Sequence, residues 1–331
     1  MQKIKLNITC LMLMLIVFLL SGGCADEYEY AVPEAKTSLQ NDCLKRTFGP
    51  HIVGLDLYFT YAMALGINEG NLISAQVEAS IPGDEGTFLE HNSYYTGSGG
   101  EDVGVEVANP SVTNGGKTQV IFERDTCAAT LRYYYVIPEQ ARGKSVSFTF
   151  SANASTGETV SCEMGPYTIA KMEMERNIVL SDDDLHYFSI ADMQAYNAAD
   201  ANNNAGNIDL VYLYRPISGI NFNHALVAPG ADSEFMPEFT VPVGINNNTK
   251  IQKVWGVRDR HLAEDRFSEF VDDLDFESLD LSDAPNYAIN LRDEYGIWVE
   301  TSDGNYRAYI YVNSVNNSSR TMTISMKRYT L

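Results

Sequence analysis

The chain has 331 residues, 45% of them apolar, which is enough for two globular domains that each bury a core of ordinary size. It carries 23 lysine and arginine residues against 44 aspartate and glutamate residues, a formal charge of −21. A field of this sign repels phosphate backbones and anionic lipid surfaces, so nucleic-acid binding is excluded as an expected function.

The first 23 residues have the layout of an export signal. Lys3 and Lys5 give a basic start, residues 10–20 are apolar without interruption, and the small residues 21–23 precede Cys24. The apolar run is about half as long as the roughly 20 residues that a membrane-spanning helix needs. Small residues directly before a cysteine resemble the lipobox of bacterial lipoproteins, which implies that Cys24 is acylated and becomes the first mature residue. We therefore expect attachment to a membrane through this lipid alone.

Acidic residues follow Cys24 closely. Asp26, Glu27 and Glu29 resemble the acidic export signal of Bacteroidetes-type surface lipoproteins, which implies a position on the outer face of the outer membrane. A solvated spacer that is acidic by coincidence is the alternative. Residues 24–48 hold few large aliphatic side chains and predict a flexible tether.

Residues 49–180 predict an immunoglobulin-like antiparallel β-sandwich. In residues 51–66 the odd-numbered positions from Val53 to Leu65 are large and apolar, which indicates a long half-buried strand. Further strand-like segments with turn residues between most of them are 73–81, 118–123, 130–138, 144–152, 159–164 and 167–175. The tryptophan between two cysteines that marks true immunoglobulin domains is missing here, so the likeness concerns the architecture.

Residues 181–331 predict a second, β-rich domain with one helix. Strands are expected at 208–215 and 251–259, and residues 296–331 read as a three-stranded C-terminal meander with turns near Asp303 and Asn316. The expected inward set of this meander is Tyr306, Ala308, Ile310 and Val312, paired with Met322, Ile324 and Met326. The expected helix places Phe267, Phe270, Val271 and Leu274 at helical spacing. The predicted fold class is therefore mainly β.

Three of the five cysteines remain once Cys10 is removed with the signal peptide and Cys24 is assigned to the lipid. Cys127 and Cys162 both lie in strand-like sequence of one domain and form the expected pair, while small buried thiols are the alternative. Cys43 is then left over.

A search for chemistry is mostly negative. Sequence motifs of serine hydrolases, zinc proteases, phosphate-binding loops and dinucleotide-binding folds are missing, so no catalytic residue, cofactor or metal is predicted. The five histidines are scattered without metal-ligand spacing: His51, His91, His186, His224 and His261. The acidic runs 182–184 and 272–283 could attract calcium, but neither has the alternating oxygens of a calcium loop.

Aromatic residues are the remaining signal. Tyr94 and Tyr95 fall in a glycine-rich segment that we expect to be a loop, where exposed rings could stack against sugars or peptide side chains. Tyr133 and Tyr135 are expected to cover a sheet face inside the core. Trp255 and Trp298 are also expected in the core. Tyr94 and Tyr95 are therefore the candidate ligand-binding residues.

The layout of lipobox, tether, sandwich and C-terminal β domain resembles the accessory, SusE-like lipoproteins of Sus-type nutrient uptake systems. More narrowly, it resembles a Bacteroidetes lipoprotein family of uncharacterised function encoded beside such transporters. The resemblance implies a non-catalytic surface protein that works with a SusC/SusD-like importer and binds a glycan or a peptide. Two alternatives stay open: a structural subunit of the transporter without a ligand, and a haem- or metal-capturing lipoprotein using His186, His224 or His261 as ligands.

Overall fold

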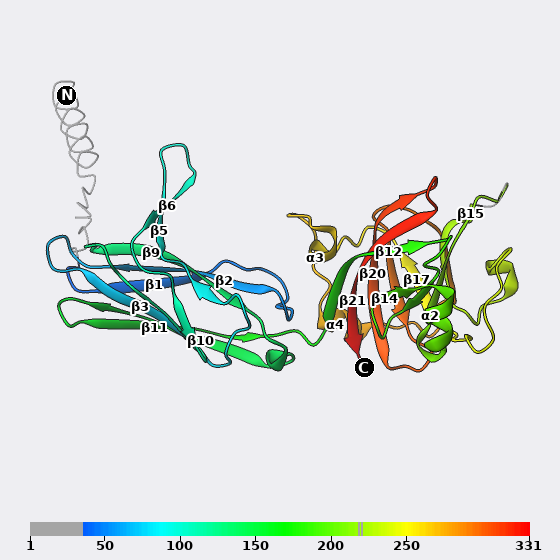
Figure 1. Cartoon of the computed structure of the whole chain (residues 1–331), viewed down its shortest axis with the longest axis horizontal. Coiled ribbons are helices and arrows are strands. Elements are labelled where there is room, and N and C mark those ends of the chain that lie inside the picture. The colour runs from blue at the N-terminus through cyan, green and yellow to red at the C-terminus, as the bar shows by residue number, and fades with distance from the viewer. Residues whose placement is uncertain (1–35, 218, 220) are drawn as a thin grey trace, which may run out of the picture. The chain divides into compact units, whose positions relative to one another are not determined.

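The computed structural model describes residues 36–217, 219 and 221–331 (Figure 1). The predicted signal peptide, the predicted acylation site Cys24 and residues 24–35 of the predicted tether lie outside these residues. Within them the protein is mainly β, with antiparallel sheets and short helices, as the sequence predicts. No helix of this described part is long and apolar enough to span a membrane.

The first domain is a two-sheet antiparallel sandwich, which confirms the predicted architecture. One sheet has the order β1 (Gln40–Lys45), β2 (Asp56–Ala64), β9 (Ala128–Val136), β4 (Phe88–Leu89). The other has the order β11 (Thr159–Thr168), β10 (Ser145–Ala154), β3 (Leu72–Ala79), β8 (Lys117–Ile121), β7 (Val112–Asn114). A short hairpin of β5 (Asn92–Thr96) and β6 (Asp102–Glu106) projects from it, and a 3-10 turn spans Glu139–Ala141.

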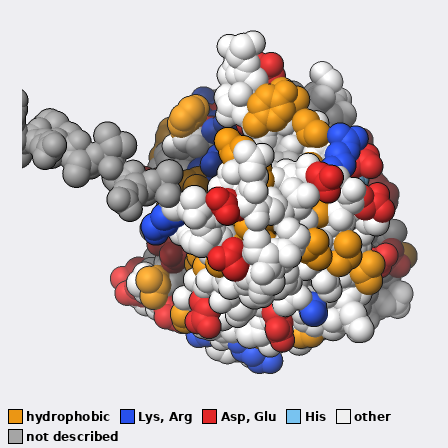
Figure 2. Space-filling model, turned by 90° about the vertical axis from the view of Figure 1, so that its left-hand side faces the viewer, with side chains coloured by type: hydrophobic (Ala, Val, Ile, Leu, Met, Phe, Trp, Pro, Cys, Tyr) orange, Lys and Arg blue, Asp and Glu red, His pale blue; other side chains and the backbone are white. Residues whose placement is uncertain are grey.

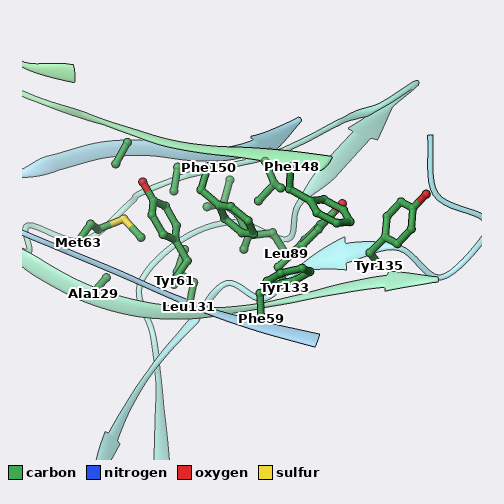
Figure 3. Packing of buried hydrophobic residues seen from close by; sticks show 14 of the residues in the cluster. Phe59, Tyr61, Met63, Leu89, Ala129, Leu131, Tyr133, Tyr135, Phe148 and Phe150 are labelled. Carbon is green, nitrogen blue, oxygen red and sulfur yellow. The ribbon is translucent and has the colours of Figure 1, made fainter. Parts of the chain in front are cut away.

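The sandwich core follows from strict alternation along its strands. In β2 the odd-numbered side chains are buried and the even-numbered ones face outward, as the spacing predicts. Figure 3 shows the aromatic centre of this core, where Phe59 packs 4.9 Å from Phe148 and Tyr61 packs 5.2 Å from Phe150, measured between ring centroids. The prediction that Tyr133 and Tyr135 lie in the core is confirmed, because both are fully buried.

Both predicted boundaries of the sandwich are wrong by one strand. Strand β1 lies inside the range predicted as tether, because its polar sequence QNDCLK conceals an edge strand that pairs with β2. At the other end, β12 (Glu173–Ser181) pairs with β21 (Thr321–Thr330) and so belongs to the second domain. The change of sheet therefore comes before Glu173 rather than at residue 181.

The second domain also has two five-stranded antiparallel sheets. One has the order β12, β21, β20 (Tyr306–Asn316), β19 (Gly296–Glu300), β17 (Lys250–Val254). The other has the order β14 (Gln194–Tyr196), β13 (Tyr187–Ser189), β15 (Leu210–Arg215), β16 (Asn223–Val227), β18 (Tyr287–Leu291). The described residues of this domain include α2 (Ala198–Asn203), α3 (Arg260–Ala263) and α4 (Asp273–Ser278), with 3-10 turns at Ala205–Asn207 and Ser233–Phe235.

The C-terminal meander forms as predicted. In the β20–β21 pair, Ile310 lies opposite Met326 and Val312 lies opposite Ile324, and all four are fully buried in the core between the two sheets. Tyr306 is half-buried and packs against the same cluster. The expected inward set of this meander is therefore confirmed.

The single helix predicted around residues 267–274 is wrong. Two shorter helices stand there, because Asp259 and Asp272 each cap a new helix N-terminus and Glu264 adopts a left-handed backbone (φ 54°) that ends the first one. Phe267, which was expected on an apolar helix face, lies in the connection between them and is 96% exposed.

Asp259 and Lys327 form a fully buried ion pair that fixes this connection. The Nζ of Lys327 lies 2.6 Å from the Asp259 carboxylate and donates a hydrogen bond to the carbonyl of Val271. The same carboxylate accepts hydrogen bonds from the backbone N–H groups of Leu262 and Val271. This buried ion pair therefore holds the segment between α3 and α4 in a non-helical conformation, where the apolar spacing predicted one regular helix.

The two tryptophans differ. Trp298 is half-buried and packs against Phe276 and Tyr309. Trp255 is 70% exposed and packs against Tyr295, so its predicted place in the core is wrong. It follows the end of the edge strand β17, where alternation no longer implies burial.

Candidate functional site

The outer face of the β1–β2–β9–β4 sheet carries a row of small side chains beside a row of aromatic ones. Its outward positions are paired across β2 and β9 as Tyr58 with Tyr134, Thr60 with Arg132, Ala62 with Thr130, and Ala64 with Ala128. On β1, Asp42 lies beside Ala62 and Gln40 lies beside Ala64. The sheet thus offers a flat floor of alanine and threonine with polar groups along one edge.

The β5–β6 hairpin stands over this floor (Figure 1). Its turn closes through a hydrogen bond from the Gly97 N–H to the Glu101 carbonyl, with Gly100 at a positive φ of 84° that glycine adopts without strain. At its base, the backbone N–H of Thr130 donates to the hydroxyl of Ser93 over 3.0 Å. The hairpin is therefore tied to β9 and forms a wall beside the floor.

Tyr94 and Tyr95 lie on this wall. The structure places them in strand β5 rather than in the loop that the glycines suggested. The guanidinium of Arg132 lies 3.6 Å from the centroid of the Tyr94 ring and forms an ion pair with Asp102 on β6. Tyr95 is 57% exposed. Arg132, on the floor strand β9, thus holds the Tyr94 ring in place, whereas the Tyr95 ring is exposed to solvent.

A groove of about 450 Å³ lies between wall and floor, within the range of about 300–1,000 Å³ that is common for ligand sites. It is lined by Gln40, Asn41, Asp42, Ala62, Met63, Ala64, Ser93, Tyr94, Tyr95, Ala128, Ala129 and Thr130. Exposed apolar side chains, orange in Figure 2, lie at the foot of the projecting segment at the top of that view. The structure therefore brings both sequence-predicted binding residues to one hollow.

A second, smaller and more polar hollow of about 180 Å³ shares Tyr94, Tyr95 and Thr130 with the groove. Its other lining residues include Tyr58, Arg132 and Asp102. The two hollows run along the same sheet face, so an extended ligand could contact both.

Three aromatic rings continue this surface along the sheet. Tyr58 stacks on Tyr134 with centroids 4.8 Å apart and planes 7° apart, and Phe88 stacks on the other side of Tyr134 at 5.0 Å. Phe88 is 42% exposed. Because these rings stack on one another, their faces are largely covered, and the row offers a ligand mainly apolar ring edges.

The site is neutral at its tyrosines and carries charged side chains at Asp42, at Arg46 and at the Arg132–Asp102 ion pair. The Glu90 carboxylate beside the Tyr94 hydroxyl raises the pKa of that hydroxyl, and burial raises the pKa of Tyr134. Both hydroxyls therefore stay protonated at neutral pH and can donate hydrogen bonds. Arg132 and Asp102 add a donor and an acceptor at the junction of the two hollows.

Sequence reasoning missed Tyr58, Tyr134 and Arg132. The available signal was the alternation itself: once the odd-numbered residues of β2 and β9 are assigned to the core, the even-numbered ones face solvent. An aromatic side chain at an outward position of such a strand does not pack in the core, so it is a candidate for ligand binding.

The three histidines considered as haem ligands are each engaged in other contacts. His224 is buried and has both ring nitrogens engaged, with Tyr212 Oη at 2.6 Å and Asn317 Oδ1 at 2.8 Å. His261 packs against Phe270, and His186 packs against Phe239. No observation here favours a haem site.

The acidic runs considered for calcium have other contacts. Asp182 forms a partly buried ion pair with Arg215 at 2.6 Å. Asp272 caps α4 in a capping box with Asp275. Within residues 36–217, 219 and 221–331, no group of three histidine, cysteine, aspartate or glutamate side chains is arranged to hold a metal ion.

The predicted pairing of Cys127 with Cys162 is wrong. Cys162 contacts Cys43 instead. Cys127 lies just before β9, where its carbonyl accepts a hydrogen bond from Leu65, whereas Cys162 lies in β11 of the other sheet, opposite Phe150. Cys43 was overlooked because its strand was assigned to the tether.

Comparisons with known proteins divide the chain as the strands do. A domain of unknown function, DUF4466, matches residues 36–169, and a second one, DUF8576, matches residues 170–331. The two matches meet just before β12, consistent with that strand belonging to the second domain. None of the curated proteins matches the chain.

Among solved structures, a DUF4466 family protein from Parabacteroides merdae matches with a TM-score of 0.84 and 44% sequence identity, over 90% of this chain and 100% of that chain. A crystal structure of BcpA, the major pilin subunit of Bacillus cereus, matches with a TM-score of 0.27 and 10% identity over 46% of each chain, which is too low to indicate a shared fold. On the strength of the Parabacteroides relative and the domain match over the sandwich, the chain belongs to the DUF4466 family.

Proposed function

We propose that the protein is a non-catalytic surface lipoprotein that holds an extended ligand in the groove beneath the β5–β6 hairpin and assists a SusC/SusD-like importer. The observation that carries the binding part is the groove itself, in which Tyr94 and Tyr95 face a floor of alanine and threonine. The proposed accessory role rests on the order of lipobox, tether, sandwich and C-terminal β domain, which resembles that of SusE-like lipoproteins.

An oligosaccharide fits this chemistry better than a peptide. Sugar rings have flat C–H faces that stack on aromatic side chains, and the exposed ring of Tyr95 supplies such a face. Their hydroxyl groups need paired donors and acceptors, which Arg132 and Asp102 provide in the smaller hollow beside the groove. Two adjoining hollows suit an oligomer rather than a single ring.

The affinity is expected to be modest. A stacking contact with an exposed tyrosine contributes roughly 1 kcal/mol, and a few such contacts must first offset the loss of translational and rotational freedom. Dissociation constants on the order of micromolar to millimolar follow. Such weak capture suits a ligand that is handed to a transporter.

Replacing Tyr95 by alanine is expected to weaken oligosaccharide binding about 5- to 10-fold, because a contact of roughly 1 kcal/mol is lost while the fold is kept. Titration calorimetry of the purified protein against panels of oligosaccharides and peptides measures this. Tyr94→Ala should cost more, since Arg132 also loses the ring beneath it. Trp255→Ala is the matched control, because it removes an exposed aromatic side chain from the other domain.

Three results would change the proposal. Binding from the peptide panel alone would keep the groove and replace the ligand class. Binding that is unchanged in the Tyr94→Ala/Tyr95→Ala double variant would move the site elsewhere. Binding to neither panel, combined with co-purification with an outer-membrane barrel, would favour a structural subunit without a ligand.

The proposed attachment to the outer membrane is tested separately, at Cys24. A Cys24→Ala variant is expected to leave the outer-membrane fraction, because the acyl chains are the proposed attachment. Cell fractionation measures this, and protease treatment of intact wild-type cells reports which side the body faces. If the variant stays in the outer-membrane fraction, the lipid anchor is not what holds the protein there.

A further inference from the structure

Two cysteines face each other at the open side of the sandwich. Cys43 lies on β1, at the edge of one sheet, and Cys162 lies on β11, at the edge of the other. In the strand register Cys43 is opposite Tyr61 and Cys162 is opposite Phe150, and the rings of Tyr61 and Phe150 pack 5.2 Å apart across the core. The two cysteines therefore sit at the same level of the sandwich, on facing strands.

Their side chains are in contact. Both thiols are free and half-buried against the same aromatic core, close enough for Cys43 and Cys162 to share a hydrogen bond. This hydrogen bond lowers the pKa of Cys162 and raises the pKa of Cys43. Cys162 is therefore the thiol that deprotonates first, with its neighbour already in place.

We propose that Cys43 and Cys162 form a disulfide that joins β1 to β11 across the open side of the sandwich. This inference uses the export step of the proposed function, because disulfides persist in compartments outside the cytosol. It does not depend on the proposed ligand or on the proposed transporter.

The chemistry balances with a disulfide oxidant of the thiol–disulfide exchange class. The Cys162 thiolate attacks one sulfur of the oxidant and releases the other as a thiolate, which leaves a mixed disulfide. Cys43 then loses its proton and attacks the Cys162 sulfur, forming the internal bond and releasing the second oxidant thiolate. The protein gives up two electrons and two protons, and the oxidant becomes a dithiol or two thiols.

The bond would hold the strand that borders the groove. β1 pairs with β2 at the edge of its sheet and contributes Gln40 and Asp42 to the groove lining. Fixing β1 to the opposite sheet constrains a loop of about 120 residues, a length at which cross-links restrict the unfolded chain strongly. The predicted result is a more stable sandwich with a fixed groove edge.

Peptide mapping of the purified full-length chain tests the bond directly. After incubation with oxidised glutathione, free thiols are alkylated under denaturing conditions, and the protein is digested with trypsin without reduction. Cys43, Cys127 and Cys162 fall in separate tryptic peptides, 37–45, 125–132 and 145–171, and Cys10 and Cys24 lie in a further peptide, 6–36. We expect a cross-link between the first and the third, with alkylated Cys127 in the second. Alkylation of all three cysteines, or a cross-link containing Cys127, would overturn the proposal.

Thermal unfolding gives a second readout that does not depend on any variant folding. Reduction of the oxidised wild type is expected to lower Tm by about 5 °C or more. Cys127→Ser, the matched control, should show the same drop, whereas Cys43→Ser should melt like the reduced wild type under both conditions. An unchanged wild-type Tm on reduction would contradict the cross-link. Because the assay is done on purified protein, loss of ligand binding or of lipidation leaves its outcome unaffected.

Discussion

Asp259→Ala is expected to lower the free energy of unfolding by about 3–5 kcal/mol. The substitution leaves the ammonium group of Lys327 buried without its counter-charge. It also removes the acceptor for the N–H groups of Leu262 and Val271, which lie on either side of the connection between α3 and α4. Breaking one partner of a buried pair costs far more than the intact pair contributes, because the remaining charge stays desolvated.

Chemical denaturation of the full chain, followed by fluorescence, measures this loss. Asp183→Ala is the control, since its carboxylate is 71% exposed and lies 3.9 Å from Arg320, an arrangement that contributes less than about 1 kcal/mol. Lys327→Met tests the same pair from the other side and should also destabilise. A loss below about 1 kcal/mol for Asp259→Ala would show that water or another group reaches Lys327.

Asp209→Asn is expected to stabilise the protein by about 2–4 kcal/mol at pH 8 and to have little effect near pH 4. Asp209 is buried, and burial raises the pKa of its carboxyl from the ordinary value of 3.8 to about 7. The folded protein therefore keeps a proton that the unfolded chain has released between these two values. Stability falls as pH rises from about 4 to 7 and then levels off, so removing the charge matters above pH 7.

Asparagine keeps an oxygen that can accept the hydrogen bond from the Ile190 N–H, which spans 2.8 Å in the structure. Unfolding curves of variant and wild type at several pH values give the difference that belongs to this group. Asp183→Asn, at an exposed carboxylate, is the matched control for the loss of one negative charge. A constant difference between pH 4 and pH 8 would mean that Asp209 is ionised throughout.

Alternation was the most reliable signal in the sequence. It identified β2 correctly, because one face of that strand lies on the core and the other faces solvent, so that burial has a period of two. In the β20–β21 hairpin it identified the set that faces the core between the two sheets, although Tyr309 and Tyr311 on the opposite face of β20 are buried as well. It failed for β1, whose residues QNDCLK are polar because an edge strand buries little. Local sequence carries little information where a segment obtains its stability from a neighbouring strand.

The helix error has a different cause. Phe267, Phe270, Val271 and Leu274 do have helical spacing, but Asp259 is held by a lysine 68 positions later in the chain. No local pattern reveals such a contact. Cys162 was paired with the wrong partner for the same reason, since the strand that contains Cys43 had not been recognised.

The candidate site could be predicted in part. Tyr94 and Tyr95 were identified from their glycine-rich surroundings, and both line the groove. The floor, the Tyr58–Tyr134 stack and the position of Arg132 depend on the register of β2 with β9, which the sequence does not specify on its own.

The two faces of β2 give the protein separate control over folding and recognition. Odd-numbered positions such as Phe59 and Tyr61 belong to the core, whereas Ala62 and Ala64 meet solvent in the groove. A mutation at an even-numbered position can reshape the floor without touching the packing that determines whether the domain folds. Relatives could therefore diversify what they bind by exchanging a few outward side chains on a conserved scaffold, with little of the usual conflict between new specificity and stability.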